Sequence, residues 1–145
     1  MFRQNFRIYR MTEDHELDLA GKIIGLAMKV HRALGPGFLE SVYENALAVE
    51  LQRAGFVFER RKLLRVTYEG VVIGDFIADL VVENSLIVEL KAVSAIVPAH
   101  ELQLVNYLTA TGIEDGLLLN FGAASLEFKR KFRTYRPPRV KELVL

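Results

Sequence analysis

The sequence predicts one domain of the α/β (α+β) class, in which helices flank a mixed β-sheet in the order ααβββαβ(β). Three observations favour this class. Apolar residues recur at helical spacing in the first third of the chain, whereas short apolar runs of strand length fill its middle. Glycine, proline and asparagine separate these segments. The length of 145 residues is enough for one well-formed core.

Two helices are expected first. Apolar residues at helical spacing indicate a helix over 14–34, which the Gly35-Pro36-Gly37 sequence ends. A second helix is expected from Leu39 to Ala54, because Gly55 follows it as a helix-ending residue. Residues 1–13 have no clear period, so we interpret them as an N-terminal tail.

The period changes after the second helix. Two strands, Leu63–Tyr68 and Val71–Glu83, are expected on either side of a turn at Glu69-Gly70. The later elements are predicted as a strand over Leu86–Val93, a helix over Pro98–Thr111 and a strand over Gly116–Phe121. A further strand over Leu126–Phe132 is the optional last element of the order. The domain then covers 14–135, and 136–145 form a C-terminal tail.

Composition excludes several classes of protein. The chain has no cysteine, which rules out a disulfide framework, thiolate-held zinc and a cysteine-ligated iron–sulfur cluster. No apolar run approaches the roughly 18–20 residues of a membrane span, and the N-terminus lacks the apolar region of a signal peptide. We therefore expect a soluble, cytoplasmic protein without membrane contact.

The strand over Leu86–Val93 is apolar except for Glu89 and Lys91, which project from one face while Leu90 points to the other. A hairpin turn at Asn84-Ser85 would bring Asp79 close to Glu89. Charges within such a run are costly unless they are paired or bind a metal. Two carboxylates and the Leu90 carbonyl suit Mg²⁺, and Lys91 could orient or deprotonate an attacking water. An ion pair between Lys91 and one acid explains the spacing equally well.

Three further polar residues fall at positions that suit the same site. Gln103 and Tyr107 are four apart on the helix over Pro98–Thr111, so they share a face. Glu40 lies in the first turn of the second helix, where it is either an acid favoured at a helix N-terminus or a third carboxylate turned toward the metal. The alternative for Gln103 and Tyr107 is an ordinary polar stripe.

Basic residues gather in two places although the net charge is only +1. One cluster, Arg60-Arg61-Lys62, stands just ahead of the first predicted strand. The other interleaves cations with aromatic residues near the C-terminus and contains Lys129, Arg130, Lys131 and Arg133. Both clusters are candidate nucleic-acid contacts. A charged edge strand that deters aggregation is an equal alternative for the second.

The segment Leu34-Gly-Pro-Gly-Phe-Leu-Glu-Ser-Val-Tyr43 resembles the signature of the GxxExxY proteins, a family assigned to the PD-(D/E)xK nuclease-like superfamily. Four more blocks match in the same order: Ala78–Val82, Val88–Lys91, Gln103–Leu108 and Gly116–Gly122. The resemblance runs from about Ile23 to Lys131, and five ordered blocks are far more specific than any single block. It implies a restriction-endonuclease-like core.

The resemblance also implies a role for each site residue. Asp79 and Glu89 become the metal-binding acids, Lys91 the catalytic lysine, and Glu40 the acid from the early helix. Gln103 and Tyr107, four residues apart, resemble the QxxxY motif of the RecB-like branch. Ala78 replaces the proline of the superfamily name. The cysteines that hold an iron–sulfur cluster in some RecB-like nucleases are absent.

The resulting hypothesis is a nuclease that depends on Mg²⁺ or Mn²⁺ and hydrolyses phosphodiester bonds of nucleic acid, with DNA expected rather than RNA. A single small domain offers little surface for gripping DNA, so a homodimer is also predicted. The alternative is a non-catalytic module on the same fold that binds nucleic acid or a partner protein.

Overall fold

The computed structural model describes residues 17–134. Its elements are α2 (Leu19–Leu34), α3 (Glu40–Arg53), β1 (Phe58–Tyr68), β2 (Val71–Val82), β3 (Leu86–Lys91), α4 (Pro98–Thr111), β4 (Asp115–Asn120) and β5 (Glu127–Phe132). The mixed sheet flanked by helices confirms the predicted class. The predicted tails, 1–13 and 136–145, lie outside the described residues, so the domain limits stay a prediction.

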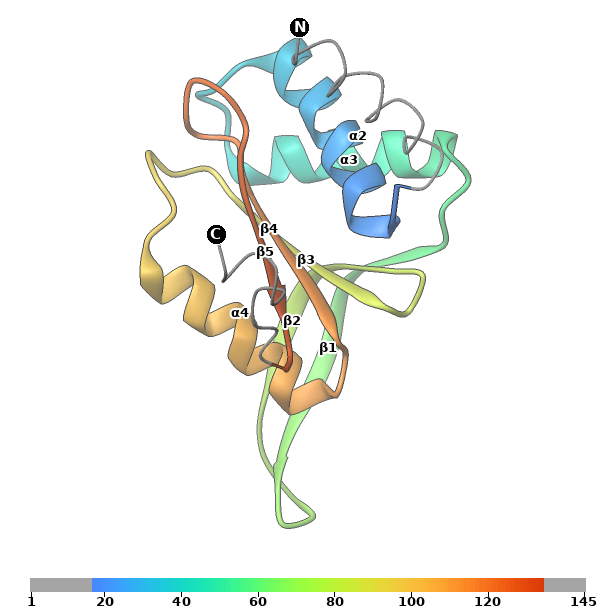
Figure 1. Cartoon of the computed structure of the whole chain (residues 1–145), viewed down its shortest axis with the longest axis vertical. Coiled ribbons are helices and arrows are strands. Elements are labelled where there is room, and N and C mark those ends of the chain that lie inside the picture. The colour runs from blue at the N-terminus through green and yellow to red at the C-terminus, as the bar shows by residue number, and fades with distance from the viewer. Residues whose placement is uncertain (1–16, 135–145) are drawn as a thin grey trace, which may run out of the picture.

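The sheet has five strands in the order β1-β2-β3-β4-β5. Only β3 and β4 pair in parallel, and the other neighbours are antiparallel. The helices α2 and α3 cover one face of the sheet, and α4 covers the other (Figure 1). Two apolar clusters follow from this arrangement, one between the sheet and α2 with α3, the other beneath α4. The described residues contain no helix that could span a membrane.

The loop between α2 and α3 fixes where Glu40 lies. Gly35 adopts a φ of 71°, a conformation that favours glycine, and so ends α2. The wholly buried Tyr43 then holds the loop, since its hydroxyl donates to the Gly35 carbonyl at 2.5 Å and accepts from the Phe38 N–H at 3.2 Å. The first turn of α3, which begins at Glu40, is therefore anchored to the rest of the fold.

The first strand was predicted too short. It begins at Phe58 rather than Leu63, so the cluster Arg60-Arg61-Lys62 lies within β1 and not ahead of it. The physical reason is that β1 pairs only with β2 and has one open edge, where charged side chains stay in solvent. The alternation of apolar and polar residues that marks a strand is therefore absent from the first half of β1, Phe58–Lys62.

Other boundaries moved by a few residues. The helix α2 begins at Leu19 because the Asp18 carboxylate accepts from the Gly21 N–H at 2.9 Å and caps it. Positions 14–16 of the predicted helix lie outside the described residues. The range of α4 is as predicted, and Gly112 ends it in the left-handed region.

Candidate active site

The strands β2 and β3 separate at Asp79. Their ladder runs from the turn at 83–85 through Val82–Leu86 to Leu80–Val88 and stops there, one residue short of Asp79 and Glu89. In place of the next ladder bonds, the Leu90 N–H donates to Asp79 Oδ2 at 2.8 Å, and the Asp79 N–H donates to Glu89 Oε2 at 3.3 Å. Asp79 and Glu89 therefore lie side by side where the strands part, as the hairpin register predicts.

An irregularity in β2 turns Asp79 toward β3. Ala78 packs in the cluster beneath α4, whereas Leu80, two residues on, packs in the cluster beneath α2 and α3. Residues two apart on a regular strand share a face, so the alternation breaks at Asp79. Opposite it in β1, Arg61 has a φ of 54°, which is unusual for a residue other than glycine. A local distortion of both strands thus presents the carboxylate at the split.

Asp79 and Glu89 repel each other electrostatically when both are ionised. Asp79 is only 7% exposed. Burial and the neighbouring charge of Asp79 raise the pKa of Glu89 to about 8, although Lys91 opposes the shift. At neutral pH the pair therefore holds a proton, or attracts a cation that replaces it.

Glu40 and Lys91 lie near this pair. Burial raises the pKa of Glu40, the charge of Asp79 raises it further, and Lys91 opposes the change. Glu40 itself is exposed at the start of α3, so these charges act on it from a distance. Glu40 and Lys91 thus lie within electrostatic range of the acids, and Asp79 and Glu89 are the two acids that hydrogen bonds bring together.

Tyr107 reaches the same place from α4, on the other face of the sheet. Its ring stacks on Phe76 with a centroid distance of 3.5 Å and an interplanar angle of 9°. Burial, followed by the charges of Glu89 and Asp79, raises the pKa of the Tyr107 hydroxyl. Gln103 is exposed one turn earlier, and within the described residues no hydrogen bond joins it to the acids. Only Tyr107 is therefore near the pair.

Two residues near Asp79 were not expected there from the sequence: Glu44, and Arg61, for which only a contact with nucleic acid was predicted. Arg61 Nη1 lies 3.4 Å from Asp79 Oδ1 and 3.9 Å from Glu44 Oε1. Glu44 is 6% exposed and also accepts from Arg60 Nη2 at 3.1 Å. The signal was available, because Glu44 stands four residues after Glu40 on the buried stripe of α3.

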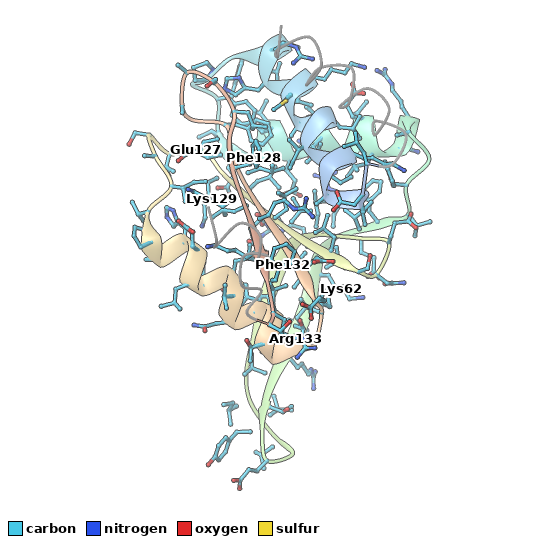
Figure 2. All side chains as sticks on the ribbon, viewed as in Figure 1. Lys62, Glu127, Phe128, Lys129, Phe132 and Arg133 are labelled. Atoms are coloured by element: carbon cyan, nitrogen blue, oxygen red, sulfur yellow. The ribbon has the colours of Figure 1, made fainter. Side chains whose placement is uncertain are left out.

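The two basic clusters do not form one surface, because β1 and β5 are opposite edges of the sheet. Lys62 pairs with Glu59, Arg130 with Asp18, Lys131 with Glu101 and Arg133 with Glu114. Figure 2 shows Lys129 beside Phe128 on β5 and Arg133 near its other end. Exposed ion pairs of this kind are weak, so they leave these cations able to meet phosphate.

The donor set fits a divalent cation. In the described part of the chain, no three His, Cys, Asp or Glu side chains cluster closely enough to hold a metal by themselves. Mg²⁺ commonly takes only one or two carboxylates and completes its shell with water and phosphate. The Lys91 carbonyl accepts from the Phe121 N–H on the β4 side, so the carbonyl of the preceding Leu90 points to the opposite side of β3, where β2 lies. The Leu90 carbonyl oxygen is therefore a third candidate ligand on the same side as the two carboxylates.

Comparison with known proteins decides the family. Residues 17–131 match the PD-(D/E)XK nuclease superfamily. The chain belongs to this superfamily. Members of this superfamily generally use divalent metal ions. The narrower resemblance to the GxxExxY proteins stays a prediction.

Two solved structures are similar to this chain. The crystal structure of SSO0001 is similar with a TM-score of 0.53 and 18% identity, over 66% of this chain and 50% of that one. This chain therefore spans half the length of that protein. The alkaline exonuclease LHK-Exo from Laribacter hongkongensis shares 13% identity over 88% of this chain and 74% of its own, with a TM-score of 0.47. No curated protein matches the chain.

Proposed function

We propose that this protein is a metal-dependent nuclease that hydrolyses phosphodiester bonds in nucleic acid, with DNA as the preferred substrate. One observation carries the proposal: two adjacent carboxylates, Asp79 and Glu89, lie at the split between β2 and β3, where burial and the charge of Asp79 raise the pKa of Glu89 to about 8. Burying two adjacent carboxylates costs stability unless cations compensate both, and the ion pair with Arg61 reaches Asp79 alone. Membership of a nuclease superfamily supports the same function.

Asp79, Glu89 and the Leu90 carbonyl would hold Mg²⁺ or Mn²⁺. When bound, such an ion polarises the scissile phosphate and lowers the pKa of a water molecule. The Leu90 N–H keeps the Asp79 carboxylate oriented through its 2.8 Å hydrogen bond. Arg61 would leave Asp79 for the substrate phosphate, because its side chain is 60% exposed and can turn outward.

Lys91 would position the attacking water or steady the charge that builds on the phosphate. Its place beside Glu89 on β3 puts the ammonium group on the same face as the acid. Glu40 would hold water at the site, in direct or water-mediated contact with the ion. Its raised pKa shows that it lies within the field of Asp79.

Substrate would be held by residues around this centre. Tyr107 would fix the backbone of the bound strand near the acids, with Gln103 one helical turn away as a second contact. The remaining cations on β1 and on or just after β5 would bind more distant phosphates: Arg60, Lys62, Lys129, Arg130, Lys131 and Arg133. Because these two groups lie at opposite sheet edges, each would meet a different part of the substrate.

A cleavage assay tests the proposal directly. Single-stranded, duplex and branched DNA, and RNA, are incubated with the purified chain in Mg²⁺, in Mn²⁺ and in chelator. We expect cleavage that needs the metal and is lost in Asp79→Asn and Lys91→Met. Matched controls are Glu50→Gln and Lys29→Met, whose residues form an ion pair with each other at 3.0 Å, apart from the acids of the split. Equal turnover by Asp79→Asn and the unaltered chain would refute the mechanism.

The same assay separates the non-catalytic alternative. A chain that binds DNA tightly but cleaves no substrate in any metal, and binds no divalent ion by calorimetry, would be a binding module on a nuclease fold. In that case Arg61 would serve as the permanent counter-cation of Asp79.

A further inference from the structure

The distal part of the β1–β2 hairpin extends beyond the helices (Figure 1). Its large apolar side chains are at least half exposed: Leu63, Tyr68, Val71, Val72, Ile73 and Ile77. A two-stranded ribbon of this kind is only marginally stable in water unless something packs on it. Contiguous apolar surface on a folded domain commonly marks a contact with another molecule.

The strand register shows which face of the hairpin is open. Leu64 and Phe76 are partners and pack in the cluster beneath α4, so that face is covered. The opposite face carries three partner pairs in sequence: Leu63 with Ile77, Arg65 with Asp75, and Thr67 with Val72. Ile73 is the extra residue of a bulge between the last two pairs. We call these seven residues the hairpin face.

Charge indicates what covers the hairpin face. The range 63–77 contains one base, Arg65, and two acids, Glu69 and Asp75. Nucleic acid selects surfaces with excess positive charge, so this stretch is unsuited to it. Arg65 and Asp75 lie directly opposite each other, yet no ion pair joins their side chains in the described part of the chain. Both charges are thus available to another protein surface.

We infer that the hairpin face binds the hairpin face of a second copy of this chain. A two-fold contact needs a surface that complements itself. Here an acid and a base lie side by side at the middle, with apolar side chains at both ends. A two-fold axis along the strands places Arg65 of one copy over Asp75 of the second copy and Leu63 over Ile77, so that the two hairpins run parallel and apolar ends meet apolar ends.

The size of the hairpin face predicts a weak dimer. Four half-exposed apolar side chains and the charged pair would cover on the order of 500 Å² per copy, at the lower end of specific interfaces. We therefore expect a dissociation constant of about 1–100 µM. This inference goes beyond the proposed nuclease function and does not depend on it.

The test is the mass of the full chain in solution, measured by analytical ultracentrifugation across a concentration series without metal or nucleic acid. Ile77→Ser should weaken dimerisation by about 10- to 30-fold, because the change counts twice in a symmetric dimer. Leu102→Ser is the matched control, since Leu102 is 61% exposed on α4 and outside the hairpin face. It should leave the dissociation constant unchanged.

A charge exchange isolates the contact between copies. Arg65→Glu carries acids at positions 65 and 75, and Asp75→Arg carries bases at both positions. Two copies of the same variant therefore repel each other, so each variant alone should be monomeric. A mixture of the two variants should form a heterodimer, because the acids of one chain face the bases of the other, although neither chain has opposite charges at its own positions 65 and 75. Folding of both variants is checked by circular dichroism.

Three outcomes would overturn the inference. The first is an unaltered chain that stays monomeric at every concentration. This outcome overturns the inference even if a variant that lacks residues 1–16 forms a dimer. The second is a dimer that Ile77→Ser and Leu102→Ser affect equally. The third is a dimer whose dissociation constant does not change with Ile77→Ser, while the affinity of the chain for DNA falls with the same substitution. That result would assign the hairpin face to nucleic acid.

Discussion

The split between β2 and β3 and the distal hairpin break opposite rules of protein folding. At the split, a carboxylate is buried at a position where an apolar side chain would cost less free energy. At the hairpin, apolar side chains are exposed to solvent at positions where polar side chains would cost less. Both regions belong to β2, which is buried from Ala78 to Val82 and mostly exposed before it. One strand thus supplies a candidate reaction centre at its end and a candidate contact surface at its start.

The largest expected effect concerns activity at the split. Asp79→Asn or Glu89→Gln should lower the rate of cleavage by about 10³-fold or more, because the ion loses a charged ligand. Single-turnover cleavage at saturating enzyme measures this. Ile77→Ser, in the hairpin, should keep the rate within about threefold under the same conditions, since saturation removes effects of weak assembly. A similar loss in both variants would remove the distinction between the regions.

The pH dependence of stability sharpens the account of the split. Glu89 has a pKa of about 8 in the folded chain and an ordinary value of 4.5 when unfolded. Between these values the folded state binds a proton that the unfolded state has lost, so the free energy of unfolding falls as pH rises. Urea unfolding at several pH values should show this fall. Glu89→Gln should flatten it, and saturating Mg²⁺ should reverse it, because metal binding favours the ionised pair.

Glu44 and Glu50 are two acids on α3 whose side chains are 7% and 13% exposed, and both form ion pairs. Glu44→Gln should cost about 1–3 kcal/mol, since it leaves Arg60 and Arg61 without their shared carboxylate. Glu50→Gln should cost less than about 1 kcal/mol, because both of its partners, Lys29 and Arg53, have largely exposed side chains. Thermal and urea unfolding supply both values. Equal costs would mean that the ion pairs around Asp79 add nothing to stability.

The smallest expected effect is on the monomer's stability at the hairpin. Ile77→Ser should change the free energy of unfolding by less than about 1 kcal/mol at a concentration where the chain is monomeric, since the side chain is 50% exposed. Leu118→Ala, at a core position 1% exposed, should cost about 2–5 kcal/mol. A large loss with Ile77→Ser would indicate that the side chain already packs within its own chain.

Most of the fold and part of the site could be predicted from the sequence. Apolar runs and glycine punctuation located β2, β3, α4 and β4, and the spacing of Glu89 and Lys91 pointed to the pair with Asp79. The start of β1 could not be predicted, because an open edge strand needs no apolar pattern. Neither could the contact of Arg61 with Asp79, since it depends on a local break in strand alternation that no residue type marks.

The most direct test of the central claim is a crystal structure of the chain soaked in Mn²⁺, examined by anomalous scattering. We expect an anomalous peak for Mn²⁺ bound by Asp79, Glu89 and the Leu90 carbonyl, with Arg61 moved away from Asp79. A well-ordered site without such a peak at saturating Mn²⁺, and with Arg61 still paired to Asp79, would contradict it.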